Sequence, residues 1–199
     1  MSQVEITPEG WAVLEDDHIS CSQDVRINRR IDFDVFGSID LCRHYWKEGA
    51  TVIDIGANIG CWSVPMARTI GPSGRLIAFE PDPGPYYCLT RNLERYPQSP
   101  SDIVNAAVWK ETGTVRFFRN PSNRGASAIN PNGQQAGGNE EFIVAAVRLD
   151  DLHLSHISFI KIDVEGAELA CLQGAERLIT DQHPVLFIET VESGQVAFG

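Results

Sequence analysis

The chain has 199 residues, of which 43% are apolar and 22% are charged, and this suits one domain with a sizeable core and requires no second one. Its formal charge of −11 argues against a long contact with nucleic-acid phosphates, because such contacts draw on clustered Lys and Arg. A nucleic-acid partner is therefore not expected.

The five cysteines are scattered, odd in number and without a Cys-x-x-Cys pair, so neither a disulfide framework nor a zinc site is indicated. The first residues include Glu5, Glu9 and Asp16, where an export signal would carry basic and apolar runs, and no apolar run approaches membrane-spanning length. We expect a cytoplasmic protein that contacts no membrane and binds no identifiable metal.

Residues 1–35 mix short extended patterns with polar turns and are expected to form a lead-in segment without a readable function. From Ser38 to Lys47 apolar residues recur at helical spacing, with Ser38 as the N-cap, which predicts a helix leading into the first strand. We therefore expect a single domain, with a lead-in over 1–48 and an α/β core over 49–199.

The run Thr51 to Ile55 is short and rich in β-branched residues, which predicts a buried parallel strand. Gly56 and Gly60 then suit a tight turn into a helix near Asn58 to Ser63, whose N–H groups would face an anionic ligand group. The spacing is not the Gly-x-Gly-x-x-Gly of dinucleotide enzymes. It favours a carboxylate, as on the methionine part of S-adenosylmethionine (SAM), over a pyrophosphate, whereas an ordinary glycine turn is the alternative.

Strands and helices alternate after this turn, which predicts a mostly parallel sheet with helices on both faces. The predicted elements are a helix from Trp62 to Ile70, a second strand from Arg75 to Phe79, a helix from Pro85 to Tyr96, a third strand from Ile103 to Ala107, a fourth strand from Ser158 to Asp163, a helix from Glu168 to Ile179 and a fifth strand from Pro184 to Glu189.

An antiparallel excursion is predicted between the third and fourth strands, where Gly113 to Arg119 and Glu141 to Leu149 read as extended segments. The stretch Asn120 to Asn139 between them is dense in Asn, Ser, Pro and Gly. A loop of this length is either functional or disordered, and the pattern does not separate the two.

Glu80 ends the second strand some twenty residues after Gly60, where a carboxylate can accept hydrogen bonds from both ribose hydroxyls of NAD or SAM. A solvated strand-end acid is the alternative. Asn105, Ala107 and Val108 close the third strand, where small and apolar residues would let an adenine ring lie flat.

The stretch from Lys161 to Glu168 places three acids and a lysine at the end of a buried strand, which is costly unless they are paired or functional. Asp163 is expected to face the ligand crevice beyond the strands, and Glu165 to hold or deprotonate an acceptor. Glu168 is interpreted as a helix N-terminal charge. For Lys161, a salt-bridge role and a functional role both stay open.

Five segments in this order resemble the FkbM family of class I SAM-dependent methyltransferases over roughly Gly49 to Glu189; they are Val52 to Gly60, Phe79-Glu80-Pro81, Asn105 to Val108, Lys161 to Glu168 and Pro184 to Glu189. The resemblance implies a Rossmann-like fold. It assigns to the SAM site Gly56, Asn58 and Gly60 at the methionine part, Glu80 at the ribose, Ala107 and Val108 at the adenine and Asp163 at the α-amino group, together with Asp54, Pro81 and Asn105. Gly125 to Ala128 resembles the family's serine-bearing loop over the active site.

The expected function is methylation of a hydroxyl group on a small molecule, such as a sugar or secondary metabolite. Glu165 and Asp163 are the catalytic candidates, and His183 is a weaker one. An NAD-linked oxidoreductase and a SAM-binding protein without transfer activity are the alternatives.

The predicted sheet is incomplete at its C-terminal edge, because this class of methyltransferase usually adds two strands after the fifth and only ten residues follow Glu189. An apolar edge strand promotes pairing with another chain. We expect it to be covered by the N-terminal 35 residues, by the excursion from Thr114 to Leu149, or by a second copy in a homodimer.

Overall fold

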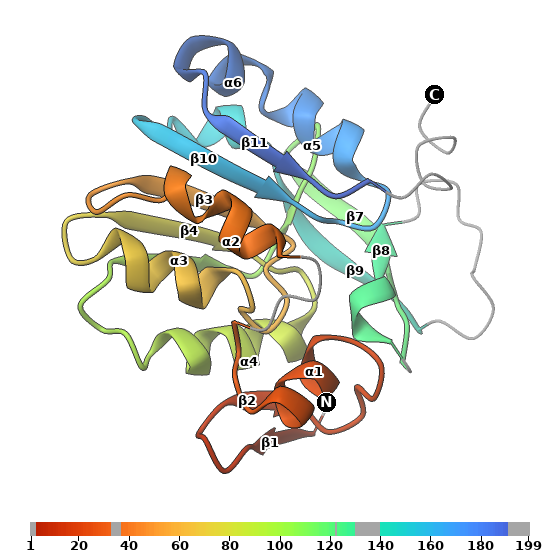
Figure 1. Cartoon of the computed structure of the whole chain (residues 1–199). Coiled ribbons are helices and arrows are strands. Elements are labelled where there is room, and N and C mark those ends of the chain that lie inside the picture. The colour runs from red at the N-terminus through yellow and green to blue at the C-terminus, as the bar shows by residue number, and fades with distance from the viewer. Residues whose placement is uncertain (1–2, 33–36, 122, 130–139, 191–199) are drawn as a thin grey trace.

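The computed structural model describes residues 3–32, 37–121, 123–129 and 140–190. Its centre is a five-stranded sheet in the order β11-β10-β3-β4-β5, in which all neighbouring strands run parallel (Figure 1). These strands are β3 (Thr51–Ile55), β4 (Arg75–Phe79), β5 (Ser101–Val104), β10 (Ile157–Ile162) and β11 (Val185–Ile188). The predicted α/β fold with a mostly parallel sheet is confirmed.

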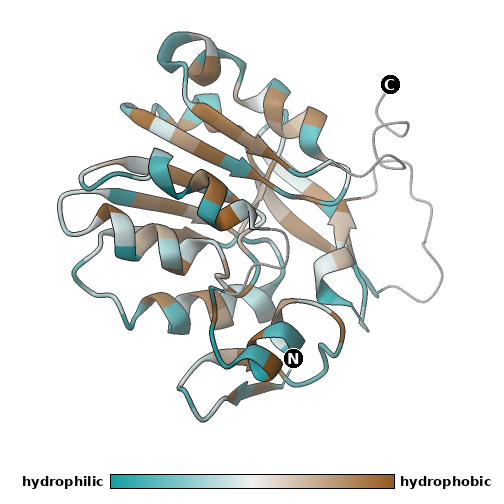
Figure 2. Ribbon diagram, viewed as in Figure 1, coloured by the Kyte–Doolittle hydropathy of each residue, from teal (hydrophilic) through white to brown (hydrophobic). Residues whose placement is uncertain are grey.

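Helices cover both faces of this sheet, and Figure 2 shows apolar residues concentrated along the central strands. One face carries α2 (Ser38–Cys42), α3 (Ser63–Ile70) and α4 (Pro83–Leu93), and the other carries α5 (Glu168–Gly174) and α6 (Glu176–Gln182). Along β4, Leu76 and Ala78 belong to one core, and Ile77 and Phe79 belong to the other. Because both faces are buried, the strand sequence is continuously apolar. None of the helices in the described ranges has the length and apolar character needed to cross a bilayer.

The third predicted strand is divided in two. Strand β5 ends at Val104, and Ala107–Val108 forms β6, which leaves the central sheet and pairs with β9. Asn105 lies at the break, where its side-chain Nδ2 donates to the carbonyl oxygens of Glu80 at 2.8 Å and Pro81 at 3.0 Å. These bonds to the end of β4 fix the point at which the chain changes sheet.

The predicted helix from Ser38 to Lys47 is shorter in the structure. Helix α2 ends at Cys42 and continues as a 3-10 turn over Arg43–Tyr45, and Gly37 holds the N-cap position that was expected for Ser38. Trp46 follows with 1% of its surface exposed and packs edge-on against Trp62 and Phe159. The chain therefore turns into the core where the pattern predicted further helix.

A second sheet has the order β6-β9-β7-β8, with β7 (Gly113–Arg119), β8 (Ala128–Ile129) and β9 (Glu140–Val147). Strands β7 and β9 are antiparallel, with Phe117 opposite Phe142, so the predicted antiparallel excursion is confirmed. The predicted loop between them includes a 3-10 turn at Arg124–Ala126 and the strand β8, whereas residues 122 and 130–139 lie outside the described ranges.

Residues 3–32 form the N-terminal layer, made of β1 (Val4–Ile6), β2 (Ala12–Leu14) and α1 (Cys21–Asn28). The layer packs on α4. Asn92 of α4 accepts from the Ala12 amide at 2.8 Å and donates to the Ala12 carbonyl at 2.9 Å, and the Arg95 guanidinium lies 3.8 Å from the centre of the Trp11 ring.

Strand β11 forms the edge of the central sheet and, among the described residues, pairs with β10 alone. The N-terminal layer packs on α4 and the excursion forms its own sheet, so neither pairs with β11 as two of the predicted covers required. The homodimer stays a prediction, which sedimentation at micromolar concentration tests.

Candidate functional site

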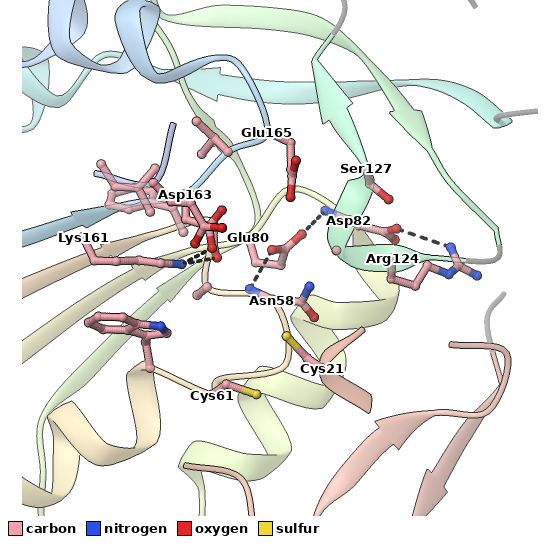
Figure 3. Close-up of a pocket in the computed structure, with 18 of the residues that line it drawn as sticks. Cys21, Asn58, Cys61, Glu80, Asp82, Arg124, Ser127, Lys161, Asp163 and Glu165 are labelled. Atoms are coloured by element: carbon pink, nitrogen blue, oxygen red, sulfur yellow. Dashed lines mark hydrogen bonds and ion pairs between the residues drawn. The ribbon is translucent and has the colours of Figure 1, made fainter. Parts of the chain in front are cut away.

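A cavity of about 320 Å³ opens at the carboxyl ends of the central strands (Figure 3). This is where ligands bind in open parallel sheets, and the volume lies in the range of small-molecule sites. Its lining comes from the segments that follow β3, β4 and β10, from β6, from the loop before β8, and from α1 and α2. Residues from both sheets and from the N-terminal layer therefore share one site.

The turn after β3 is shaped by the close approach of β10. Gly56 has φ +76°, and a Cβ on it would lie 1.8 Å from the Asp163 carbonyl oxygen, so only glycine fits there. Gly56 and Asn58 line the cavity. Gly60 does not; a Cβ on it would lie 3.1 Å from Leu89. Gly60 thus serves the packing of the turn on α4.

The expected row of outward-facing N–H groups is not present in this turn. The amides of Gly56 and Ala57 both donate to the Phe79 carbonyl at 3.0 Å, and the Asn58 amide donates to the Glu80 carboxylate at 2.9 Å. The helix begins at Ser63, the last residue of the range predicted for its start. The expectation fails because β4 takes up these donors before the helix starts.

Glu80 lies at the end of β4 with 6% of its surface exposed. Its carboxylate accepts from the backbone amides of Asn58 at 2.9 Å and Asp82 at 2.8 Å, one on each oxygen. Burial raises the pKa of Glu80 to about 8, against the opposing effect of these two hydrogen bonds. The two bonds hold the carboxyl group in place at the cavity wall, with acceptor capacity left for a ligand.

Lys161 is 2% exposed and is held by three oxygen atoms. Its Nζ lies 2.9 Å from the Gly56 carbonyl, 3.2 Å from Asp163 Oδ2 and 3.4 Å from Asp54 Oδ1. Burial alone would lower the pKa of Lys161, but the carboxylates of Asp163 and Asp54 raise it above its ordinary value. Of the two roles left open, the geometry favours the salt-bridge partner.

Asp54 does not line the cavity and is fully buried behind Lys161. It also accepts a hydrogen bond from Ser63 Oγ at 2.6 Å. Asp163 lines the cavity and keeps 30% of its side chain exposed. Asp54 thus orients the lysine, and Asp163 presents a carboxylate to the cavity.

Glu165 follows on the same loop and points into the cavity (Figure 3). Its φ is +53°, and the next residue, Gly166, has φ +98°, so two successive residues turn the chain sharply at the end of β10. Burial, followed by the nearby carboxylates of Asp163 and Glu189, raises the pKa of Glu165 to about 7. A carboxyl group with this pKa is suited to proton transfer near neutral pH.

Glu168 and His183 lie away from the cavity lining. Glu168 begins α5 and accepts from the Gly166 amide at 2.8 Å, which agrees with its interpretation as a helix-terminal acid. His183 is the C-cap of α6, at the start of β11, whereas the cavity is at the other end of that strand.

Ala107 and Val108 line the cavity together with Phe79 and Ala106, and they give it one apolar wall. Pro81 lines it as well. Asn105 does not line it; its side-chain amide donates to the Glu80 and Pro81 carbonyl oxygens. Ser127, from the serine-bearing loop, is on the lining and its Oγ accepts from the Asn120 amide at 3.1 Å.

An ionic network that the sequence analysis missed connects three segments at the cavity. Asp82, the N-cap of α4, pairs with Arg119 at 2.7 Å and with Arg124 at 3.5 Å. Arg124 also pairs with Asp16, and the Gly125 amide donates to Ser20 Oγ at 3.1 Å. The Asp82-Pro83 pair is a helix-start signal that marks Asp82, but no local signal marks its partners.

The sheet order, the glycine turn after the first strand and the acid after the second define a Rossmann-like fold of the class I SAM-dependent methyltransferases. The family model described as "Methyltransferase FkbM domain" matches residues 54–198. The chain belongs to the FkbM methyltransferase family.

Two curated fungal relatives carry methyltransferase names. "Methyltransferase 1" of Beauveria bassiana is 26% identical, over 69% of this chain and 61% of its own length. "Methyltransferase sdnD" of Sordaria araneosa is 29% identical, over 63% of this chain and 60% of its own length. The chain thus spans about three fifths of these relatives.

Among solved structures, the methyltransferase FkbM from Methylobacillus flagellatus matches with a TM-score of 0.52 and 24% identity, over 71% of this chain and 33% of that one. This likeness agrees with the fold.

Proposed function

We propose that the protein transfers a methyl group from SAM to a hydroxyl group on a small molecule, such as a sugar or a secondary metabolite. The observation that carries this proposal is Glu165, a carboxyl group with a pKa of about 7 that lines the same cavity as Glu80. A methyltransferase acting on a hydroxyl group benefits from such a base, because the acceptor oxygen must lose its proton.

The residues present fit the ribose, adenine and α-amino groups of SAM. The Gly56 turn lines the cavity at the end of β3, and the missing Cβ lets the Asp163 backbone pack against it. Glu80 offers carboxylate oxygens for the ribose hydroxyls, and Ala107 and Val108 offer an apolar wall for the adenine ring. Asp163 suits the α-amino group, and excess carboxylates suit a ligand that carries a sulfonium and an ammonium group.

When SAM is bound, it supplies a methyl group already activated by the positive sulfur. The protein then has to hold the donor and the acceptor in line and exclude water. Glu165 takes the proton of the acceptor hydroxyl at one of its carboxylate oxygens. Lys161 holds the Asp163 carboxylate in place through their 3.2 Å contact. Glu80 fixes the ribose end with a carboxyl group that the Asn58 and Asp82 amides hold.

Calorimetric titration with SAM and with NAD tests the donor. We expect SAM to bind; tight binding of NAD with no response to SAM would instead support a Rossmann oxidoreductase. Incubation with methyl-labelled SAM and a metabolite extract tests transfer. Binding of SAM without label in any acceptor would support a SAM-binding protein that lacks transfer activity.

A further inference from the structure

One wall of the cavity comes from outside the segment that matches the family. The family match begins at residue 54, yet Cys21, Asp24 and Val25 of α1, together with Ile31 and Ile39, line the cavity. The Cys21 side chain interacts with that of Cys61, two residues before α3; both are labelled in Figure 3. We call Cys21, Asp24, Val25, Ile31 and Ile39 the α1 wall; all five precede the matched segment.

The α1 wall is fastened just before the first residue of α1. Arg124, which is 5% exposed, pairs with Asp16 just before α1 and with Asp82 at the start of α4. The Gly125 amide donates to Ser20 Oγ at 3.1 Å, immediately before the first residue of α1. Buried ion pairs and hydrogen bonds of this kind fix position. The wall therefore has a set shape and can discriminate between ligands.

The charges on the cavity lining are unequal. Six carboxyl groups and two cations face it, and they are Asp24, Glu80, Asp82, Asp163, Glu165, Glu189, Lys161 and Arg124. Both cations are already paired with carboxylates, Lys161 with Asp54 and Asp163, and Arg124 with Asp16 and Asp82. Among the described lining residues, no cation is left to receive an anionic group.

We propose that Asp24 of the α1 wall selects the acceptor and that the acceptor is an uncharged hydroxyl compound, without phosphate or carboxylate. This inference rests on the proposed methyl transfer. Asp24 accepts a hydrogen bond from a neutral acceptor, whereas a phosphate or carboxylate would meet Asp24 and Glu165 as like charges in a partly desolvated space.

The first test separates a metabolite extract of the source organism by anion exchange. The neutral flow-through and the bound anionic fraction are each incubated with the protein and methyl-labelled SAM. We expect most of the label to enter compounds of the flow-through. Equal or greater labelling of the anionic fraction would overturn the acceptor inference while methyl transfer stands. Label in neither fraction, despite SAM binding, would overturn methyl transfer and the inference with it.

The second test reverses the charge of the wall. Asp24→Arg should raise labelling of the anionic fraction relative to the neutral one by about tenfold or more, with unchanged SAM affinity by calorimetry. Asp24→Asn should shift the ratio in the same direction by less, and it serves if the arginine variant does not fold. Asp40→Arg is the matched control, since it makes the same charge change on a side chain that is 85% exposed and off the cavity.

The Asp40→Arg variant should leave the labelling ratio as in the wild type. If both Asp24 variants keep the wild-type ratio, the α1 wall does not select by charge and the inference is wrong. A large loss of SAM affinity in Asp24→Asn would also overturn it, because Asp24 would then belong to the donor site.

Discussion

The backbone of Gly56 lies against the carbonyl oxygen of Asp163, so close that a Cβ would come within 1.8 Å of that oxygen. This contact joins the end of β3 to the end of β10, the two strands whose loops carry Asn58 and Glu165. The spacing of the glycine turn from the Glu165 loop, and hence the width of the cavity, depends on the absence of a side chain at Gly56.

We expect Gly56→Ala to lower the free energy of unfolding by about 3 kcal/mol and to abolish SAM binding, because the methyl group overlaps backbone and the left-handed φ is strained. Urea unfolding and calorimetry measure the two effects. Gly113→Ala is the control, since no atom lies within 4 Å of a Cβ there and its φ is not positive. A stable Gly56→Ala variant that binds SAM normally would contradict the packing argument.

We expect Glu80→Ala to weaken SAM binding by about 1 to 3 kcal/mol, the scale of leaving buried ribose hydroxyl groups without their hydrogen-bond acceptor. Calorimetry measures the affinity, with thermal unfolding to verify that the variant is folded, because Glu80 also holds the Asn58 and Asp82 amides. Glu94→Ala is a suitable control on exposed α4 surface. An affinity equal to that of the wild type would show that Glu80 does not bind SAM and has only a structural role at the end of β4.

We expect Glu165→Gln to keep SAM affinity and to slow transfer to a hydroxyl acceptor about a hundredfold or more, as for loss of a general base. In the wild type the rate should rise with pH through about 7, because the raised pKa keeps Glu165 protonated, and inactive as a base, below that value. The variant should lose this dependence. Equal losses in affinity and rate would place Glu165 in the donor site instead.

The same carboxyl group predicts a change of stability with pH. Its pKa is raised from 4.5 to about 7 by burial and by neighbouring acids, so between these values the folded state holds a proton that the unfolded state releases. The contribution of Glu165 to stability should therefore decline as pH rises from about 4.5 to about 7. Urea unfolding across this range should show Glu165→Gln gaining stability relative to the wild type as pH rises. A constant difference would show that the pKa of Glu165 is not raised.

The sequence was enough to place Gly56, Glu80 and Glu165 at one cavity, because each follows a predicted parallel strand and the carboxyl ends of such strands lie at the same edge of the sheet. The sequence also assigned Asn105 to the SAM site, but this residue does not line the cavity; its side-chain amide donates to the backbone at the end of β4. Sequence analysis missed Asp24 and Arg124. Their segments meet through tertiary packing, as in the hydrogen bond that joins Arg124 to Asp16 over 108 positions, and no periodicity or motif records such a contact.

The network around Arg124 yields the last prediction. Arg124→Met should lower the free energy of unfolding by about 2 to 3 kcal/mol. This is near the lower end of the usual cost of breaking a buried ion pair, because Asp82 loses Arg124 but keeps its pair with Arg119. The loss of stability should be largest in the N-terminal layer, because this variant lacks the ion pair between Arg124 and Asp16. Hydrogen exchange should therefore speed up more in α1 than in β3. Arg116→Met, which removes an exposed pair with Glu141, should cost about 0 to 1 kcal/mol. If exchange in α1 stays as slow as in the wild type while stability falls, the arginine supports the core and does not hold the layer in place.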